Sequence, residues 1–530
     1  MQSPTPMVEM ESEQPFKYDY AKCDLDYCDN YALHMQNACY VCGGTYCFEH
    51  VEDTHHHICF TDPPEQKIYK SGDMFSWRFD VPEILKLIDY DAVVEEVEGL
   101  RPGHKCIEII KPRMHRSFIR MVGSFNFHIA IYFDDGVKWV MRIRRTSARH
   151  QPELAISHCH SSELATLKAL EDAGVKIPKS YERPNNSKVS KYLLYLYQDL
   201  IEGSRTWDIF PISYNDDSLT PAGTRFIQDY AAWMISLEKI VSHGSVGSFC
   251  FSGNDKQIVV GPHIDHIMNL NLDFPYYAGP FDTAKERWIY IIESRMKLIL
   301  DKREVSPSQE LLQYLIMLEM RELVYGCAEF DHGPWYLKHY DLHQGNFIVD
   351  GDSGEMKAII DWEWASFTCK EEAFAAPPWF SKEETDDHIG NKAEELIKAY
   401  ENLGRQDLAE FVRNGDKFKR LDNVLLHSVK DLNYLNDTRR AFFQLPGDQP
   451  EDTPTTIEQW MEMRITRYID IDQGLRVIFE RRPSTKVPQL RRRSSFIREK
   501  LAKEQEQERK KINEQVDPAD YHLPDSDDET

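Results

Sequence analysis

Short apolar runs separated by turn residues mark the chain between residues 104 and 203. Three runs rich in β-branched and aromatic side chains predict strands: residues 117–121, 127–133 and 137–143. The tripeptide Asp134-Asp135-Gly136 joins the last two runs and predicts a hairpin turn. A further run over residues 192–203 predicts a buried strand that leads into a connector. These runs together predict a small sheet.

Helical periodicity dominates much of the remaining chain. The amphipathic run at residues 81–88 predicts a segment that packs on the main body instead of forming a flexible linker. The tripeptide at 161–163, Ser-Ser-Glu, is expected to open a helix that ends near Gly174. Further helices are predicted over residues 224–241, 283–300, 309–327, 391–414 and 416–435. A larger helical part therefore follows the sheet.

A second hairpin is predicted from two short apolar runs, 347–349 and 356–360, around the Gly-rich turn 351–354. It would hold Asn346, just before its first strand, near Asp361, just after its second. Asp341 lies in the loop that enters the hairpin. The sequence therefore predicts one corner that contains two carboxylates and an amide.

Phosphoryl transfer needs such a set, because the attacking hydroxyl needs a carboxylate partner and phosphate-bound Mg²⁺ needs oxygen ligands. The spacing His339-x-Asp341-x4-Asn346, followed by Asp361, fits the catalytic loop and metal ligand of kinases. Asp341 would accept the hydroxyl proton, and Asn346 and Asp361 would hold Mg²⁺. A hairpin that has polar ends by chance is the weaker interpretation, because four positions match the kinase spacing with the hairpin between them: His339, Asp341, Asn346 and Asp361.

The segment His339-Tyr-Asp-Leu-His-Gln-Gly-Asn346, with Ile359-Ile-Asp-Trp-Glu363, resembles the aminoglycoside phosphotransferase and choline-kinase-like family, most closely its fungal phosphotransferase-family proteins. The resemblance implies an α+β, bilobal protein-kinase-like fold with a small β-rich N-lobe and a large helical C-lobe. It also implies ATP as the cofactor and His339 as part of the catalytic loop. The family usually has Gly where this chain has Tyr340, which could crowd the substrate side.

The same resemblance implies the nucleotide contacts. Arg142 takes the place of the phosphate-binding Lys, and Glu163 could pair with it; a surface Arg and a capping Glu are the alternative. The phosphate-covering loop would include Gly123, Ser124 and Asn126, without the G-x-G-x-x-G pattern of protein kinases. Backbone groups around Tyr197, Asp199 and Leu200 would receive adenine in the hinge.

Net charge, the length of the apolar runs and one missing motif exclude several classes of function. The 530 residues carry a net charge of −25, which argues against a general nucleic-acid-binding surface. No apolar run reaches the length of a membrane span, so we expect a cytoplasmic or nuclear protein without a membrane partner. No Ala-Pro-Glu segment follows Asp361, which favours a small-molecule acceptor over a protein substrate.

Six of the eleven cysteines lie between residues 23 and 59, interspersed with histidines. Eight soft or borderline ligands suit two tetrahedral zinc ions, and such a segment could hardly fold without metal. Their order resembles the AN-one-type zinc finger, whose cross-brace implies two ligand sets: Cys23, Cys28, Cys47 and His50 for one ion, and Cys39, Cys42, His57 and Cys59 for the other. His56 could replace His57.

We expect a flexible N-terminus (residues 1–19), the zinc finger (20–62) and a connecting segment (63–100). The kinase-like N-lobe (101–200) and C-lobe (201–482) follow, and a charged, largely disordered tail (483–530) comes last. Three arginines at 491–493 precede Ser494 and Ser495, which would suit a kinase that recognises basic residues. A plain solvated tail is the alternative.

Two functions compete at this point. The first is an ATP- and Mg²⁺-dependent phosphotransferase acting on a small hydroxylated or amino-bearing acceptor. The second is a catalytically weak, pseudokinase-like scaffold whose zinc finger binds a protein partner. Asp341, Asn346 and Asp361 favour the enzyme, whereas Arg142 and Tyr340 favour the scaffold.

We predict that residues 20–62, purified as a segment, bind two zinc ions, because a closed structural site takes four ligands. Cross-bracing should make both sites depend on each other, so Cys39→Ser should disorder the whole segment. Metal analysis and the dispersion of amide resonances test this. One zinc or none in the unsubstituted segment would contradict the two-site interpretation.

Overall fold

The computed structural model describes residues 20–22, 31–33, 77–111, 122–145, 152–210, 218–253, 256–264, 276–303, 305–306, 308–380, 390–426, 429, 431–443 and 453–481. The chain divides into two units, Met1–Asp73 and Met74–Thr530. In the first unit, β1 (Tyr20–Lys22) pairs antiparallel with β2 (Tyr31–Leu33). The candidate zinc ligands, the predicted strand 117–121 and the tail 483–530 lie outside the described residues.

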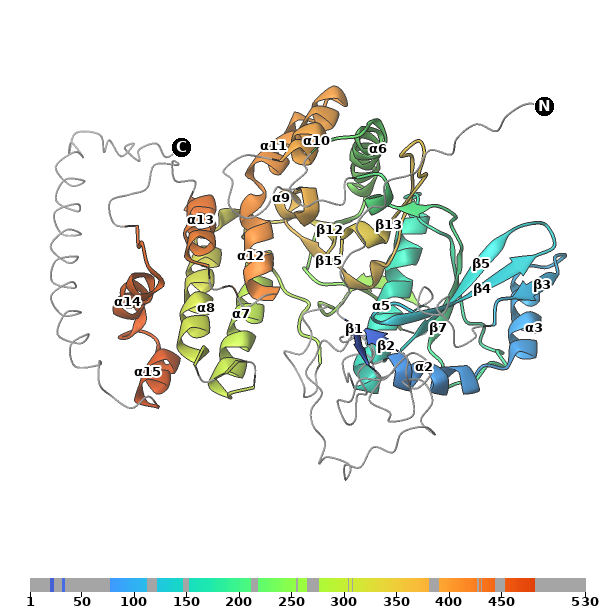
Figure 1. Cartoon of the computed structure of the whole chain (residues 1–530), viewed down its shortest axis with the longest axis horizontal. Coiled ribbons are helices and arrows are strands. Elements are labelled where there is room, and N and C mark those ends of the chain that lie inside the picture. Colours follow the sequence, from blue (N-terminus) through green and yellow to red (C-terminus); the bar gives the residue numbers. More distant parts are fainter. Residues whose placement is uncertain are drawn as a thin grey trace, which may run out of the picture. The chain divides into compact units, whose positions relative to one another are not determined.

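The described N-terminal part of the second unit, residues 77–199, is termed the small lobe. Its five-stranded antiparallel sheet has the order β3-β4-β5-β7-β6, seen on the right of Figure 1. The strands are β3 (Cys106–Ile109), β4 (Asn126–Phe133), β5 (Lys138–Arg144), β6 (Ser180–Glu182) and β7 (Tyr195–Asp199). The predicted hairpin of β4 and β5 is confirmed, whereas β3 was not predicted from the sequence.

Side chains that point to the buried face of β4 form much of the core of the small lobe. Phe127, Ile129 and Ile131 are buried on one face, where they join apolar residues of α2 (Trp77–Lys86) and α3 (Tyr90–Leu100). Val81 and Ile84 of α2 are buried in this core. The prediction that residues 81–88 pack on the main body is therefore confirmed.

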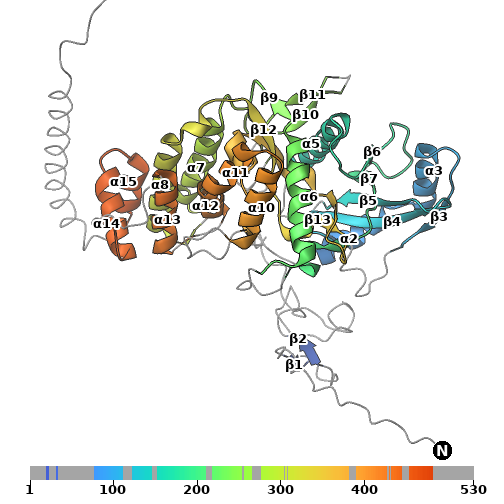
Figure 2. The same ribbon diagram turned by 90° about the horizontal axis from the view of Figure 1, so that it is seen from above.

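Helix α5 (Glu153–Asp172) begins earlier than predicted. The Ser-Ser pair at 161–162 lies in the middle of the helix, so the prediction that it opens the helix is wrong. Pro152 stands at the N-cap, and Ala155, Ile156 and Cys159 extend the buried stripe toward the N-terminus at helical spacing. The hairpin of β10 (Phe249–Ser252) and β11 (Gln257–Val260) lies against α5 (Figure 2).

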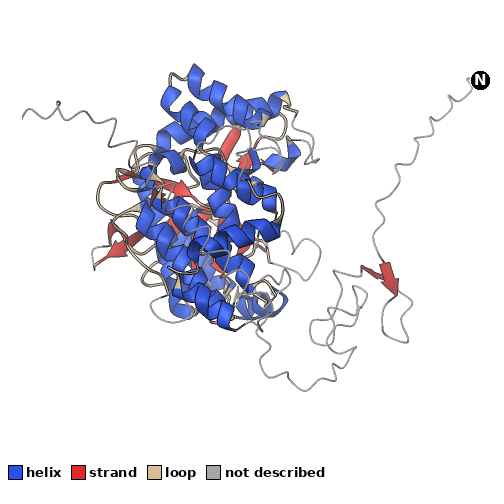
Figure 3. Cartoon of the chain, turned by 90° about the vertical axis from the view of Figure 1, so that its left-hand side faces the viewer, coloured by secondary structure: helices blue, strands red, loops and turns tan. Residues whose placement is uncertain are grey.

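Residues 204–481 form the large lobe, which is mostly helical (Figure 3). Its longer helices are α6 (Pro221–Leu237), α7 (Ala284–Leu300), α8 (Glu310–Tyr325), α10 (Asn391–Asn402), α11 (Gln406–Asn414), α12 (Asp416–Leu426), α13 (Leu432–Phe443), α14 (Ile457–Tyr468) and α15 (Gln473–Glu480). The predicted mixture of sheet and helix with a helical C-terminal part is thus confirmed. No helix among the described residues combines the length and apolarity needed to cross a membrane.

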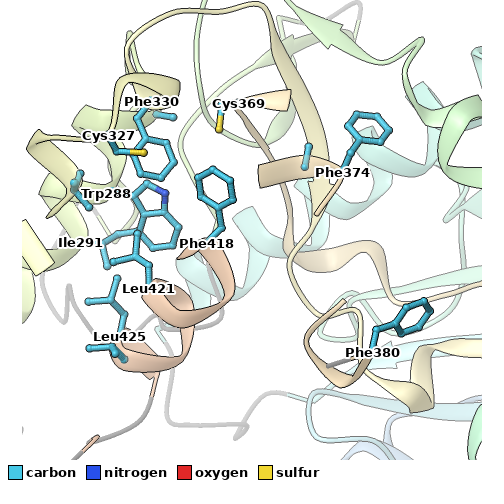
Figure 4. Close-up of a cluster of buried hydrophobic side chains, with 14 of the residues drawn as sticks. Trp288, Ile291, Cys327, Phe330, Cys369, Phe374, Phe380, Phe418, Leu421 and Leu425 are labelled. Atoms are coloured by element: carbon cyan, nitrogen blue, oxygen red, sulfur yellow. The ribbon is translucent and has the colours of Figure 1, made fainter. Parts of the chain in front are cut away.

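Two of the predicted helices are each divided in two. Residues 391–414 contain α10 and α11, which separate at Gly404, where φ is +72°. Residues 416–435 contain α12 and the start of α13. Aromatic side chains from several helices meet in the core of the large lobe, among them Trp288, Phe330 and Phe418 (Figure 4).

The second hairpin is confirmed: β13 (Phe347–Val349) pairs antiparallel with β14 (Met356–Ile359). On its other side β13 pairs with β8 (Ser204–Arg205), the first strand after the small lobe. The turn of the hairpin lies against α6, where Asp229 accepts a hydrogen bond from the Met356 amide at 3.1 Å. Gly354, with φ of +75°, lies against the N-terminal part of α6, and a Cβ there would lie 2.0 Å from the Ala222 carbonyl oxygen.

Substitution of Gly354 tests this close approach. Gly354→Ala should lower the free energy of unfolding by at least about 3 kcal/mol, because backbone strain and overlap with α6 add. Gly404→Ala is the matched control, since its φ is similar but nothing lies within 4 Å of the added Cβ. It should lower the stability by only about 1–2 kcal/mol.

Urea unfolding followed by tryptophan fluorescence measures both variants. All ten tryptophans lie beyond residue 74, so the signal reports on the second unit alone. Equal losses for the two variants would show that the turn does not press on α6.

Candidate active site

The loop that carries Asp341 is fixed by a buried imidazole. His339 ends β12 (Trp335–His339) and is only 3% exposed. Its Nε2 donates to the Ile360 carbonyl oxygen at 3.0 Å, and its Nδ1 accepts from the Asp341 amide at 3.2 Å. These two bonds define a neutral ring, and burial lowers the pKa of His339 accordingly. His339 thereby ties the loop of Asp341 to the end of β14.

Asn346 lies in the short helical turn η4 (Gln344–Asn346) and is buried. Its amide nitrogen donates to the Asp341 carbonyl oxygen at 2.7 Å and faces the Asp341 carboxylate at 3.3 Å. The amide oxygen is therefore the atom of this side chain that remains for a cation. His343, which the sequence argument did not single out, caps η4 and places Nε2 3.7 Å from the Asp341 carboxylate.

Asp361 follows β14 in the left-handed region, with φ 69° and ψ 56°. Aspartate tolerates this conformation better than most residues, and such backbone strain is concentrated at functional sites. The Ile360 amide donates to the Asn346 carbonyl oxygen at 3.0 Å, so Asp361 is held beside Asn346. The structure thus brings together the three predicted oxygen-bearing residues.

Arg142 bridges two carboxylates. Its Nη1 donates to Glu163 of α5, and its Nη2 donates to Asp361. The Arg142 side chain is 5% exposed, and that of Asp361 is 29% exposed. Burial favours the neutral form of Asp361, but the charge of Arg142 outweighs it and holds the pKa of this carboxyl below its ordinary value. The predicted Arg142–Glu163 pair exists in the structure; its role toward a nucleotide stays a prediction.

A second arginine on the same face of β5 was missed. Arg144 pairs with the buried Glu363, which lies in the turn η5 (Trp362–Trp364). The guanidinium carbon of Arg144 stands 5.0 Å from the Phe125 ring and 5.6 Å from the Trp364 ring. The spacing of two from Arg142 and the Asp-Trp-Glu sequence could have indicated this pair.

Glu363 lies between two arginines and an amide. Asn126 donates to it at 3.5 Å, and Arg142 Nη2 approaches it to 3.9 Å. Burial nonetheless raises the pKa of Glu363 to about 7. Asp361 is therefore the more acidic of these two neighbouring carboxyl groups.

The predicted phosphate-covering loop is a tight turn between Val122 and Phe127. The Gly123 amide donates to the Asn126 carbonyl oxygen at 2.8 Å, and the carbonyl oxygens of Gly123 and Ser124 accept from Arg145 at 2.9 Å each. These bonds fix the backbone of the loop. The structure places Asn126 against Glu363, and the phosphate contact of the loop stays a prediction.

In the predicted hinge, the backbone takes part in the sheet. The Asp199 amide donates to the Lys179 carbonyl oxygen and the Leu200 amide to the Lys138 carbonyl oxygen, both at 2.9 Å. Tyr197 is fully buried, and its hydroxyl donates to Glu96 of α3 at 2.9 Å. The adenine contact of Tyr197, Asp199 and Leu200 stays a prediction.

Tyr340 is held within the large lobe. Its hydroxyl donates to Glu372 at 2.8 Å and accepts from Arg287. Glu372 is completely buried and also accepts from Lys338 at 3.0 Å and from the Trp288 indole at 3.2 Å. The donors around Glu372 hold its pKa far below the ordinary value despite burial. The Tyr340 hydroxyl is therefore bound in this buried cluster.

Comparison with known proteins matches the central part of this site. The model of the phosphotransferase enzyme family (APH) matches residues 279–368. This segment runs from just before α7 to the end of β15 (Ala365–Thr368). It includes Asp341, Asn346 and Asp361 but not Arg142 or Glu163. No curated protein matches the chain.

Several solved structures resemble the chain at low identity. The ADP-bound aminoglycoside phosphotransferase APH(2'')-Ib is 13% identical with a TM-score of 0.38, and the alignment covers 67% of this chain and 98% of that one. A type I macrolide 2'-phosphotransferase is 15% identical, with a TM-score of 0.35 and coverages of 68% and 99%. The ethanolamine kinase of Plasmodium vivax is 12% identical, with a TM-score of 0.36 and coverages of 73% and 97%.

Proposed function

We propose that the protein is an ATP- and Mg²⁺-dependent phosphotransferase that acts on a small hydroxylated or amino-bearing acceptor. The observation that carries this proposal is the joint placement of Asp341, Asn346 and Asp361: His339 and Asn346 each bond to Asp341 and also to Ile360, the residue before Asp361. The match of residues 279–368 to the phosphotransferase family supports it independently.

Asp341 is the proposed proton acceptor. Its carboxylate is 31% exposed, so an acceptor can reach it, while its backbone is fixed by His339 and Asn346. For a hydroxyl acceptor, the oxygen bonds to the γ-phosphorus as the bond from that phosphorus to the bridging oxygen breaks. The hydroxyl proton passes to Asp341, and ADP leaves with the electron pair of the broken bond.

Asn346 and Asp361 are the proposed ligands for Mg²⁺. The Asn346 amide nitrogen is occupied by Asp341, which leaves the amide oxygen, and Asp361, which follows the Ile360 amide that bonds to Asn346, supplies an ionised carboxylate. Such hard oxygen donors, with water and phosphate oxygens completing the shell, suit this cation. When bound, Mg²⁺ would offset the charge on the β- and γ-phosphates.

Arg142 is the proposed partner of the nucleotide phosphates. It is fixed by the buried Glu163, and its guanidinium already reaches Asp361, the proposed metal ligand. A phosphate that approaches the metal site therefore comes within reach of Arg142. Because a guanidinium is always charged and has several N–H donors, Arg142 can donate to a phosphate oxygen while it stays paired with Glu163, and can serve where the family has Lys.

We expect Asp341→Asn to lower kcat by at least about 10²-fold and to leave ATP affinity unchanged, since Asp341 acts on the acceptor. The assay is ADP release with a panel of small hydroxylated and amine-bearing compounds. Asp352→Asn, an exposed aspartate in the hairpin turn, is the matched control and should retain wild-type turnover. Wild-type turnover by Asp341→Asn would remove the catalytic assignment. Nucleotide binding without turnover of any acceptor would favour the scaffold.

Asp361→Ala should weaken nucleotide binding in the presence of Mg²⁺ more than Asp341→Asn does, because it removes a proposed metal ligand. Calorimetric titration of ATP with and without Mg²⁺ measures this, and the difference between the two conditions should shrink only in Asp361→Ala. If both substitutions had equal effects, the two aspartates would not have separate roles.

A further inference from the structure

We propose that the Arg142 guanidinium exchanges between Asp361 and the nucleotide phosphates, so that nucleotide and Mg²⁺ bind to this chain as a thermodynamically coupled pair. This inference rests on the proposed function. It adds a competition between Arg142 and the metal for one carboxylate.

The geometry places Arg142 on the proposed metal ligand. Nη2 of Arg142 donates to Asp361 and lies 3.9 Å from Glu363, while Nη1 donates to Glu163. The Asp361 carboxylate is thus already paired with a guanidinium that is almost completely buried. A cation that enters at Asp361 must displace this group or accept its repulsion, which is large where solvent screening is weak.

Phosphate relieves this competition. Nη2 can leave Asp361 for a phosphate oxygen while Nη1 stays on Glu163, so Arg142 is not left without a partner. The carboxylate then becomes free for the metal. By linkage, whatever factor nucleotide adds to metal affinity, metal adds to nucleotide affinity.

Arginine is required for this bridge because its two Nη atoms reach different carboxylates. A lysine at this position keeps the charge but has a single nitrogen. It should pair with Glu163, because Glu163 is 3% exposed and the Asp361 side chain 29%, and the more buried carboxylate is the more costly to leave unpaired. Arg142→Lys should therefore vacate Asp361 without changing the net charge of the site.

The experiment measures Mn²⁺ affinity by electron paramagnetic resonance, with and without a non-hydrolysable ATP analogue. In the wild type, the analogue should raise Mn²⁺ affinity at least about tenfold. In Arg142→Lys, Mn²⁺ alone should bind several-fold more tightly than in the wild type, and the enhancement by the analogue should fall. Lys138→Arg is the control, because Lys138 lies on the same strand as Arg142 but pairs with Glu202 instead of Asp361 or Glu163. This variant should behave as the wild type.

Glu163→Gln provides the opposite change. With Glu163 neutral, Arg142 should remain on Asp361, so Mn²⁺ alone should bind more weakly than in the wild type. Unchanged Mn²⁺ affinity and unchanged enhancement in Arg142→Lys would overturn the exchange and leave the phosphotransferase proposal standing. Failure of the wild-type protein to bind the analogue with or without Mn²⁺ would overturn both.

Discussion

Buried ion pairs between the two lobes are the interaction on which the site depends. Arg142 and Arg144 project from one face of β5 in the small lobe, and Asp361 and Glu363 follow β14 in the large lobe. Removal of one partner from a buried pair costs about 3–5 kcal/mol because it leaves an uncompensated charge, so loss of either partner would disturb this contact between the lobes. The same four residues line the proposed phosphate and metal site, so the contact between the lobes and the proposed site share these side chains.

The large lobe supplies a rigid support behind Asp341. His339 and Tyr340, on either side of one peptide bond, contact different neighbours: His339 bonds to Ile360, and Tyr340 to Glu372. The Tyr340 amide also donates to the Trp364 carbonyl oxygen at 3.3 Å. Tyr340 is therefore accommodated as part of a buried polar cluster, in which its hydroxyl is bound.

Much of the site could be predicted because its determinants are local. The turn 351–354 and the two apolar runs around it determine the hairpin, and the hairpin alone brings Asn346 to Asp361. Alternation predicts that Arg142 and Arg144 share a face of β5, but not that Glu363 pairs with Arg144, because that contact joins residues 219 positions apart. The start of α5 was misplaced for a similar reason: serines can cap a helix, and only the tertiary contacts of Ala155 and Cys159 show that the helix extends past them.

Helix α5 contacts both lobes. It carries Glu163 for the small lobe, yet Ala155 and Cys159 pack with Ile264, Tyr277 and Trp364 of the large lobe, and the Tyr277 hydroxyl donates to the Ala155 carbonyl oxygen at 3.2 Å. The β10–β11 hairpin lies against the same helix. The Arg142–Glu163 pair therefore joins the sheet of the small lobe to a helix that also packs on the large lobe. A movement of the small-lobe sheet away from the large lobe would therefore act on the Arg142–Glu163 pair as well as on the pairs of Arg142 with Asp361 and of Arg144 with Glu363.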